Sequence, residues 1–233
     1  MRLFAAVVPP PAALEHLEVA LRAVGGDPNR RRGPLRWTEP DARHLTLAFY
    51  GEVPEGYLDE LTRALADVAA ATAPFRLALR GAGVFDGRTL WVGCSGDTDT
   101  LQALMAGAGA VGSDVLRRDP DNRSRAHLTV ARVRSGARHR PDRRGRARRR
   151  PGERPAAWPD GGTRPAGPAA PMAPGGDAEP ADVQALAHAL AIYEGPAWTV
   201  REIALLASDL GAGHRGAPRY DVVHLAALGA VAG

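Results

Sequence analysis

Two short segments of this chain share a pattern that restricts what it can fold into. Residues 44–47 read His-Leu-Thr-Leu and residues 127–130 read His-Leu-Thr-Val, and they lead into apolar runs at 45–50 and 128–133. Apolar runs of this length are typical of short buried strands. Because side chains in a strand alternate between two faces, the histidine and threonine of each copy fall on one face and the apolar residues on the other. A fold that buries both runs therefore presents two imidazoles and two hydroxyls.

The chain around these two motifs alternates strand-like and helix-like segments. Apolar residues recur at helical intervals in four segments, which are 12–24, 55–71, 98–115 and 181–195. Further strands are expected at 3–8, 35–38, 75–80, 88–93, 198–206 and 220–225, and a glycine-rich loop at 81–87. This order, without the glycine fingerprints of dinucleotide or phosphate-binding loops, predicts an α+β fold rather than a doubly wound nucleotide fold.

Residues 134–180 differ in composition from both flanks. Arginines crowd residues 138–150, and the stretch after them is rich in Pro, Gly and Ala with almost no apolar side chains to bury. Such a composition favours disorder. We interpret 1–133 and 181–228 as one domain and 134–180 as an insertion. Three interpretations of the insertion stay open: an arginine-rich arm for RNA phosphates, a solvated insertion, or a stretch of altered reading frame.

Composition limits the classes of partner and site. The 30 basic residues are all arginines, and the formal net charge of +4 permits a polyanion as partner. Cys94 is the only cysteine, and no Asp, Glu or His group at ligand spacing flanks either motif, so we expect no metal and no cofactor. The N-terminal apolar run stops at Pro9, too early to span a membrane. We expect a cytoplasmic protein, monomeric and without a membrane partner.

A pair of histidines suits hydrolysis of a cyclic phosphodiester. An imidazole near its ordinary pKa can be a neutral base or a charged acid at working pH. One ring would take the proton of the attacking water while the other protonates the departing ribose oxygen. The candidates are His44 and His127, with the hydroxyls of Thr46 and Thr129 donating to the phosphate oxygens.

At these residues the chain resembles the LigT-like RNA 2′,3′-cyclic phosphodiesterases, also called RNA 2′-5′ ligases, of the two-histidine (2H) phosphoesterase superfamily. The similarity covers most of the chain outside the insertion. The residues that carry it are 2–7, 36–37, 44–51, 127–132, 198–208 and Tyr220.

This resemblance implies a bilobal, pseudo-symmetric fold in which two antiparallel sheets line a central cleft, with the helices outside. It implies His44 and His127 as the catalytic pair and Thr46 and Thr129 as the phosphate binders. The family usually assigns leaving-group protonation to the first histidine and water activation to the second, whereas the residues themselves leave the two roles open. The implied product carries a 2′-phosphate, and 2′-5′ ligation is the reverse chemistry. The insertion after Arg132 departs from the family pattern.

Two further residues are candidate substrate contacts. Strict alternation points Arg132 away from His127 unless a bulge re-aims it, so a phosphate or ribose contact and a surface salt bridge both stay open. Phe4 could stack on a base, although an aromatic ring in a first strand is more often part of the core. Trp37 is interpreted as packing, and Phe85 is left open.

Three hypotheses for function remain. The first is a metal-independent phosphodiesterase that acts on RNA 2′,3′-cyclic phosphate ends. The second keeps the enzyme but moves the substrate to a small cyclic nucleotide phosphate, because the motifs contact only the phosphate and its ribose. The third is a catalytically silent RNA-binding protein.

Overall fold

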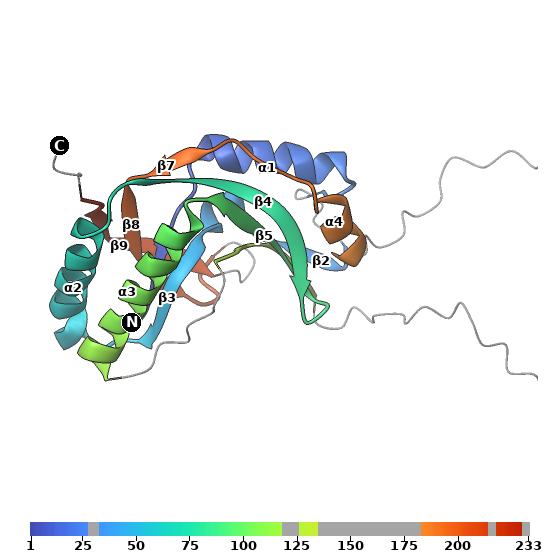
Figure 1. Ribbon diagram of the computed structural model, residues 1–233. Coiled ribbons are helices and arrows are strands. Elements are labelled where there is room, and N and C mark those ends of the chain that lie inside the picture. Colours follow the sequence, from blue (N-terminus) through green and yellow to red (C-terminus); the bar gives the residue numbers. More distant parts are fainter. Residues whose placement is uncertain (28–32, 118–125, 135–182, 214–217, 230–233) are drawn as a thin grey trace, which may run out of the picture. The chain divides into compact units, whose positions relative to one another are not determined.

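The computed structural model describes residues 1–27, 33–117, 126–134, 183–213 and 218–229 (Figure 1). The strands are β1 (Arg2–Val7), β2 (Leu35–Trp37), β3 (Leu45–Glu52), β4 (Phe75–Phe85), β5 (Thr89–Gly96), β6 (Leu128–Val133), β7 (Trp198–Val200), β8 (Glu202–Asp209) and β9 (Arg219–Ala227). The helices are α1 (Pro11–Ala23), α2 (Leu58–Ala70), α3 (Thr98–Leu116) and α4 (Val183–Ala189), with 3-10 turns η1 (Pro40–Ala42) and η2 (Glu55–Tyr57). The predicted α+β class is confirmed.

The nine strands of the described ranges belong to one curled antiparallel sheet in the order β7-β4-β5-β6-β3-β1-β8-β9, with β2 added beside β6. The two sheets expected from the sequence are therefore halves of a single sheet. They are joined where β3 pairs with β6, at Leu45 opposite Leu128. Because these are the second residues of the two His-x-Thr motifs, the seam between the halves brings the motifs together.

Helices cover each half separately, which gives the expected bilobal arrangement. Helices α2 and α3 pack on each other, and between them they contact β3, β8 and β9. Helices α1 and α4 instead contact β4, and α4 also contacts β5 (Figure 1). The helical periodicity explains this packing, since α2 buries Leu61, Leu65 and Ala69 at four-residue intervals.

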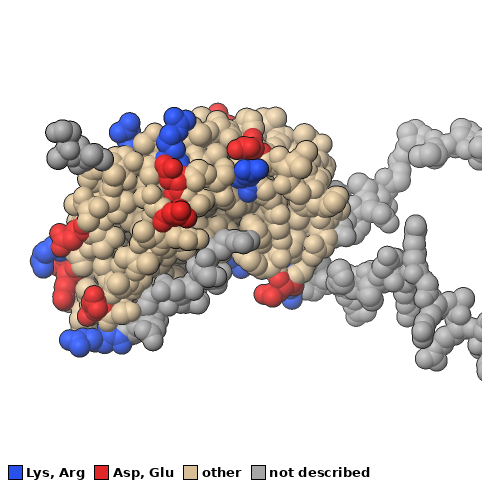
Figure 2. Space-filling view, viewed as in Figure 1, with Lys and Arg blue, Asp and Glu red and all other residues tan. Residues whose placement is uncertain are grey.

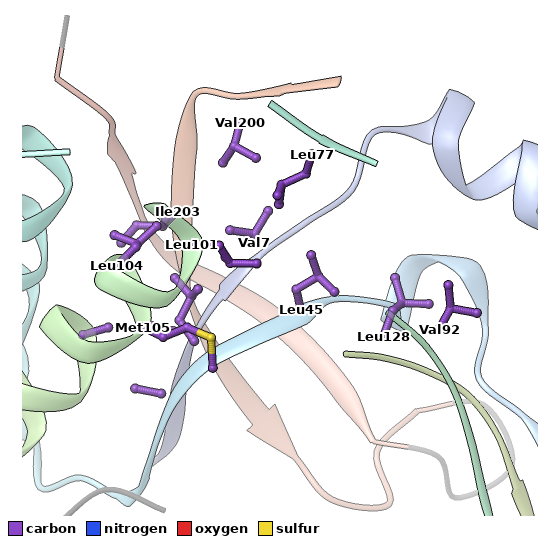
Figure 3. Close-up of a cluster of buried hydrophobic side chains, with 14 of the residues drawn as sticks. Val7, Leu45, Leu77, Val92, Leu101, Leu104, Met105, Leu128, Val200 and Ile203 are labelled. Atoms are coloured by element: carbon purple, nitrogen blue, oxygen red, sulfur yellow. The ribbon is translucent and has the colours of Figure 1, made fainter. Parts of the chain in front are cut away.

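A continuous apolar core runs beneath the seam. Leu45 and Leu128 are fully buried, and Val7, Leu77 and Val92 surround them in the same cluster (Figure 3). The apolar residue between the histidine and the threonine of each motif is thus an anchor. Burial of one such side chain stabilises the fold by about 1.5–3 kcal/mol, which fixes the motif backbone that carries the polar side chains.

Two predicted elements were wrong in detail. The segment 81–87 is mostly strand, because β4 continues to Phe85, and the hairpin turn is formed by residues 86–88, of which Asp86 and Gly87 have positive φ. A glycine suits position 83 of this strand because the indole of Trp91 occupies the space that a side chain there would need. The predicted strand 198–206 is two strands, β7 and β8, which pair with β4 and β1 at opposite parts of the sheet.

The compact unit described above is formed by residues 1–134 and 180–233. The predicted insertion, 134–180, lies almost wholly outside the described residues. None of the helices in the described ranges is long and apolar enough to span a bilayer. On the face drawn in Figure 2, acidic and basic side chains are interspersed, without a large patch of one sign.

Candidate active site

Both motif strands contain a bulge immediately after the threonine. Along β6, Thr129 lies opposite Trp91 and Ala131 opposite Leu90, which leaves Val130 as an extra residue. Along β3, Thr46 lies opposite Ala6 and Ala48 opposite Ala5, which leaves Leu47 as the extra residue. A bulge interrupts the alternation of side chains and turns the following residues to the other face. The two motifs therefore share a distortion as well as a sequence pattern.

The bulges change which residue follows each threonine on the polar face. Thr46 and Phe49 both line one pocket, and Thr129 and Arg132 line the same pocket. In each strand the two residues between them are buried. Alternation alone would have pointed Arg132 away from His127, and the bulge at Val130 re-aims it.

The pocket has a volume of about 760 Å³ and is lined by His44, Thr46, His127 and Thr129 together. Each histidine comes directly before its motif strand rather than within it. The charge of His127 contributes to lowering the pKa of His44, so the two imidazoles are close enough to interact. The structure thus brings together the four side chains that the sequence singled out.

His44 is held in one tautomer. Its Nδ1 lies 3.0 Å from the carbonyl oxygen of Ala42, and because a carbonyl can only accept, Nδ1 carries the proton. The ring packs against Phe4, with centroids 4.6 Å apart, and edge-on against Tyr220 at 5.1 Å. Burial lowers the pKa of His44 to about 4; the Ala42 bond opposes this shift and the charge of His127 adds to it. At pH 7 the ring is therefore neutral, with a lone pair on Nε2.

His127 has aromatic neighbours of its own. Its ring is edge-on to Phe85 at 4.8 Å and to Trp91 at 6.4 Å, and these two rings stack on each other. Phe85, which the sequence left open, thus packs against a motif histidine. Each imidazole is flanked by two aromatic rings, but those around His44 also line the pocket.

Arginines supply the charge of the pocket, whose lining includes Arg2, Arg36, Arg132 and Arg219. Three of them act on the hydroxyl of Tyr220. Burial raises the pKa of this hydroxyl, while the charges of Arg132, Arg36 and Arg2 act to lower it. Arg219 also pairs with Asp221 at 3.0 Å. Two carboxylates, Glu39 and Asp41, lie on the lining as well. The balance favours an anionic ligand.

Sequence reasoning missed part of this lining. Tyr220 and Arg36 were noticed only as points of resemblance. The pairing of β2 with β6 explains the position of Arg36, because it places Arg36 opposite Arg132. Trp37, interpreted as packing, both lines the pocket and packs on the core. Phe4 lines the pocket but is only 3% exposed, and its ring contacts His44 and Tyr220.

In the described part of the chain, no three His, Cys, Asp or Glu side chains are grouped so that they could hold a metal ion. The acids on the lining therefore do not form a recognisable coordination shell with the motif histidines.

Comparisons with known proteins point to one family. The family model for LigT-like phosphoesterases matches residues 8–91. An RNA 2′,3′-cyclic phosphodiesterase of Archaeoglobus fulgidus is 30% identical over 137 residues, which is 57% of this chain and 73% of the relative. One from Geobacillus stearothermophilus is 43% identical over 70 residues, or 30% of this chain and 22% of the relative. One from Aquifex aeolicus is 28% identical, over 43% of this chain and 56% of the relative. The chain thus spans less than two thirds of the length of these last two relatives.

Solved structures show the same fold at lower sequence identity. A Thermus thermophilus protein superposes with a TM-score of 0.63 at 23% identity, covering 99% of this chain and all of that one. Escherichia coli LigT in its apo form superposes with a TM-score of 0.58 at 22% identity, covering 98% and 97%. At this level of identity the likeness concerns the arrangement of the strands and helices.

Proposed function

The chain belongs to the LigT-like phosphoesterase family, and from that premise we propose that it hydrolyses the 2′,3′-cyclic phosphodiester at RNA ends to a 2′-phosphate. The observation that carries the proposal is the single pocket lined by both motif histidines and both motif threonines. The relatives named RNA 2′,3′-cyclic phosphodiesterases support the choice of substrate. So do the arginines of the pocket, which suit a polyanion better than a neutral ligand.

The proposed reaction needs a base and an acid on opposite sides of phosphorus. The oxygen of water attacks phosphorus, and its proton passes to a neutral imidazole. The bond from phosphorus to the ribose O3′ breaks, and O3′ takes a proton from an imidazolium. His44 and His127 are the proposed pair, and Thr46 and Thr129 donate hydrogen bonds to the two non-bridging oxygens as negative charge builds on them. If a ribose 5′-hydroxyl takes the place of the attacking water, the same proton transfers form a 2′-5′ phosphodiester bond while the bond from phosphorus to O3′ breaks.

The environment of His44 bears on how the two roles are divided. In the free protein the lowered pKa keeps His44 neutral, which is the state of a base. To serve as the acid, as the family resemblance implies, it must gain a proton when the anionic phosphate enters the pocket. A nearby negative charge favours the protonated imidazole, so substrate binding acts in that direction. The proposed partner is an RNA end, bound by a monomer without metal or other cofactor.

The test is hydrolysis of an RNA oligonucleotide that ends in a 2′,3′-cyclic phosphate, in the presence of excess EDTA, with the product identified as 2′- or 3′-phosphate. We expect chelator-resistant turnover to the 2′-phosphate. A mononucleotide 2′,3′-cyclic phosphate, assayed in parallel, should be the poorer substrate; if it is the better one, the enzyme acts on small cyclic nucleotides. Tight RNA binding without turnover would contradict the proposal and indicate a silent RNA-binding protein.

A further inference from the structure

Arg43 is the one buried charged side chain among the described residues, with an exposure of 1%. Arginine is almost never fully buried unless it is paired. Its guanidinium forms an ion pair with Glu18 of α1, whose side chain is 13% exposed. Arg43 directly precedes His44 but is not part of the pocket lining. A buried ion pair therefore ties a helix to the residue next to a motif histidine.

The remaining contacts of Arg43 connect the two motifs. Its Nε donates to the carbonyl oxygen of Thr38 at 3.1 Å. The amide of Thr38 in turn donates to the carbonyl of Val130 at 2.8 Å, and Val130 is the bulged residue of β6. The segment 38–43 thus runs from the bulge of the second motif to the histidine of the first, and Arg43 lies across it.

The same segment supplies the partner of the imidazole. Arg43 closes η1 with its own amide, which donates to the carbonyl of Pro40 at 3.2 Å. That turn presents the carbonyl of Ala42 to Nδ1 of His44. A displacement of the turn would therefore change both the tautomer of His44 and its distance from the second motif.

Stability alone gives a poor account of this arrangement. A buried ion pair often contributes no more than well-packed apolar side chains of the same volume. Here the protein groups in the described part of the chain also offer no hydrogen-bond partner to Nη1 of Arg43, so they satisfy the guanidinium only in part. Burial lowers the pKa of Arg43, and the carboxylate of Glu18 opposes that shift. The pair is better explained by the position that it imposes on segment 38–43.

We propose that the Arg43–Glu18 ion pair is a positioning device that fixes segment 38–43, and so sets the tautomer of His44 and its placement relative to the His127 motif. The proposal rests on the proposed phosphodiesterase function only for its kinetic consequence. Arg43 and Glu18 act through His44 and do not themselves contact the substrate.

The sharpest test replaces both charges by apolar side chains, in the double variant Arg43→Met/Glu18→Leu. Because no charge is left unpaired, we expect this variant to fold with a native or higher Tm. We expect kcat to fall by about 10- to 100-fold, as for a catalytic group displaced by about 1 Å, while KM changes by less than about threefold. Glu15→Gln on the exposed side of the same helix and Arg22→Ala, which removes the exposed partner of Glu18, should leave kcat within about twofold.

A spectroscopic measurement separates positioning from activity. In ¹⁵N–¹H correlation spectra at pH 7, the native His44 should show the Nδ1-protonated tautomer alone, and the double variant a mixture of tautomers. The single variant Arg43→Lys keeps a positive charge opposite the native Glu18. Its kcat should lie between that of the double variant and that of the native protein. This spectrum can be recorded whether or not the native protein hydrolyses cyclic phosphates. Failure of the proposed function can therefore be distinguished from failure of the positioning proposal.

Two outcomes would overturn the proposal. One is a folded double variant with native kcat and an unchanged His44 tautomer. The other is a double variant that does not fold, since the pair would then be required for the fold itself and not for placing His44.

Discussion

The two halves of the site begin from the same local structure and end with different chemistry. Both have a histidine before the strand, a threonine, a bulge, and a pocket-facing residue three positions after the threonine. That last residue is Phe49 in one half and Arg132 in the other. His44 is bonded to the Ala42 carbonyl and enclosed by rings that line the pocket, whereas His127 rests on Phe85 and Trp91 behind it. The repeated backbone gives both halves the same local geometry, whereas the side chains around the two imidazoles differ.

The largest expected effect comes from removing either imidazole. His44→Ala and His127→Ala should each lower kcat by about 10² or more, because acid and base must act in the same step. The double variant should lose little more than either single variant, since the two groups act as a unit. Steady-state kinetics on the cyclic-ended oligonucleotide measures this, with His188→Ala, an exposed histidine of α4, as the control. A near-native rate in either single variant would break the pairing of the two halves.

The threonines should show how far the symmetry extends. Thr46→Val and Thr129→Val keep the shape of the side chain and remove the hydroxyl, and each should lower kcat on the order of 10- to 100-fold, through a lost hydrogen bond to a charged phosphate. Thr→Ser at either position retains the hydroxyl and should restore most of the rate. Equal losses at the two positions would support equivalent phosphate contacts; a loss at one position alone would mean that only one half contacts the phosphate.

Arg132 and Phe49 occupy equivalent places, so their variants isolate the difference between the halves. Arg132→Met should raise KM about tenfold by removing a charge from the pocket. Phe49→Leu should change KM by less than about threefold, because an apolar side chain of similar size remains. Arg134→Met, at an exposed arginine just past β6, is the matched control. Equal KM values for Arg132→Met and the control would show that the bulge does not bring Arg132 to the substrate.

The pKa of His44 provides the smallest but most specific contrast. In an NMR titration of the free protein, His44 should remain neutral until the pH falls to about 4, well below the ordinary histidine value of about 6.5. Saturating inorganic phosphate should raise this midpoint, because an adjacent anion stabilises the protonated ring. The same shift should appear in the limb of the pH profile that His44 governs, as a higher pKa in kcat, which reports the complex, than in kcat/KM, which reports the free enzyme. An unshifted midpoint would place the phosphate away from His44.

The comparison also shows what the sequence could reveal. The repeated motif and its apolar anchors, Leu45 and Leu128, were visible because burial of alternate residues leaves a periodic pattern. The bulges were not, because Leu47 and Val130 are ordinary apolar residues whose displacement depends on the partner strands β1 and β5. The orientation of Arg132 was therefore undetermined until the register was known.

Burial of charge was hidden for a similar reason. An arginine such as Arg43 is expected at the surface from sequence alone. The ion pair with Glu18 depends on where α1 lies in the fold. The strand through 81–85 was hidden by its glycines, which favour a loop in sequence, although Gly83 here makes room for the ring of Trp91. In both cases a contact with another segment of the chain determines the structure, against the expectation from the neighbouring residues in sequence.

The most direct test of the account is a crystal structure of the protein with an RNA end that carries a 2′-phosphate. We predict one phosphate group within hydrogen-bonding distance, about 3 Å, of Nε2 of His44, of the imidazole of His127 and of both motif hydroxyls. A phosphate bound only by the pocket arginines, with the two imidazoles too far apart to contact it together, would contradict the central claim.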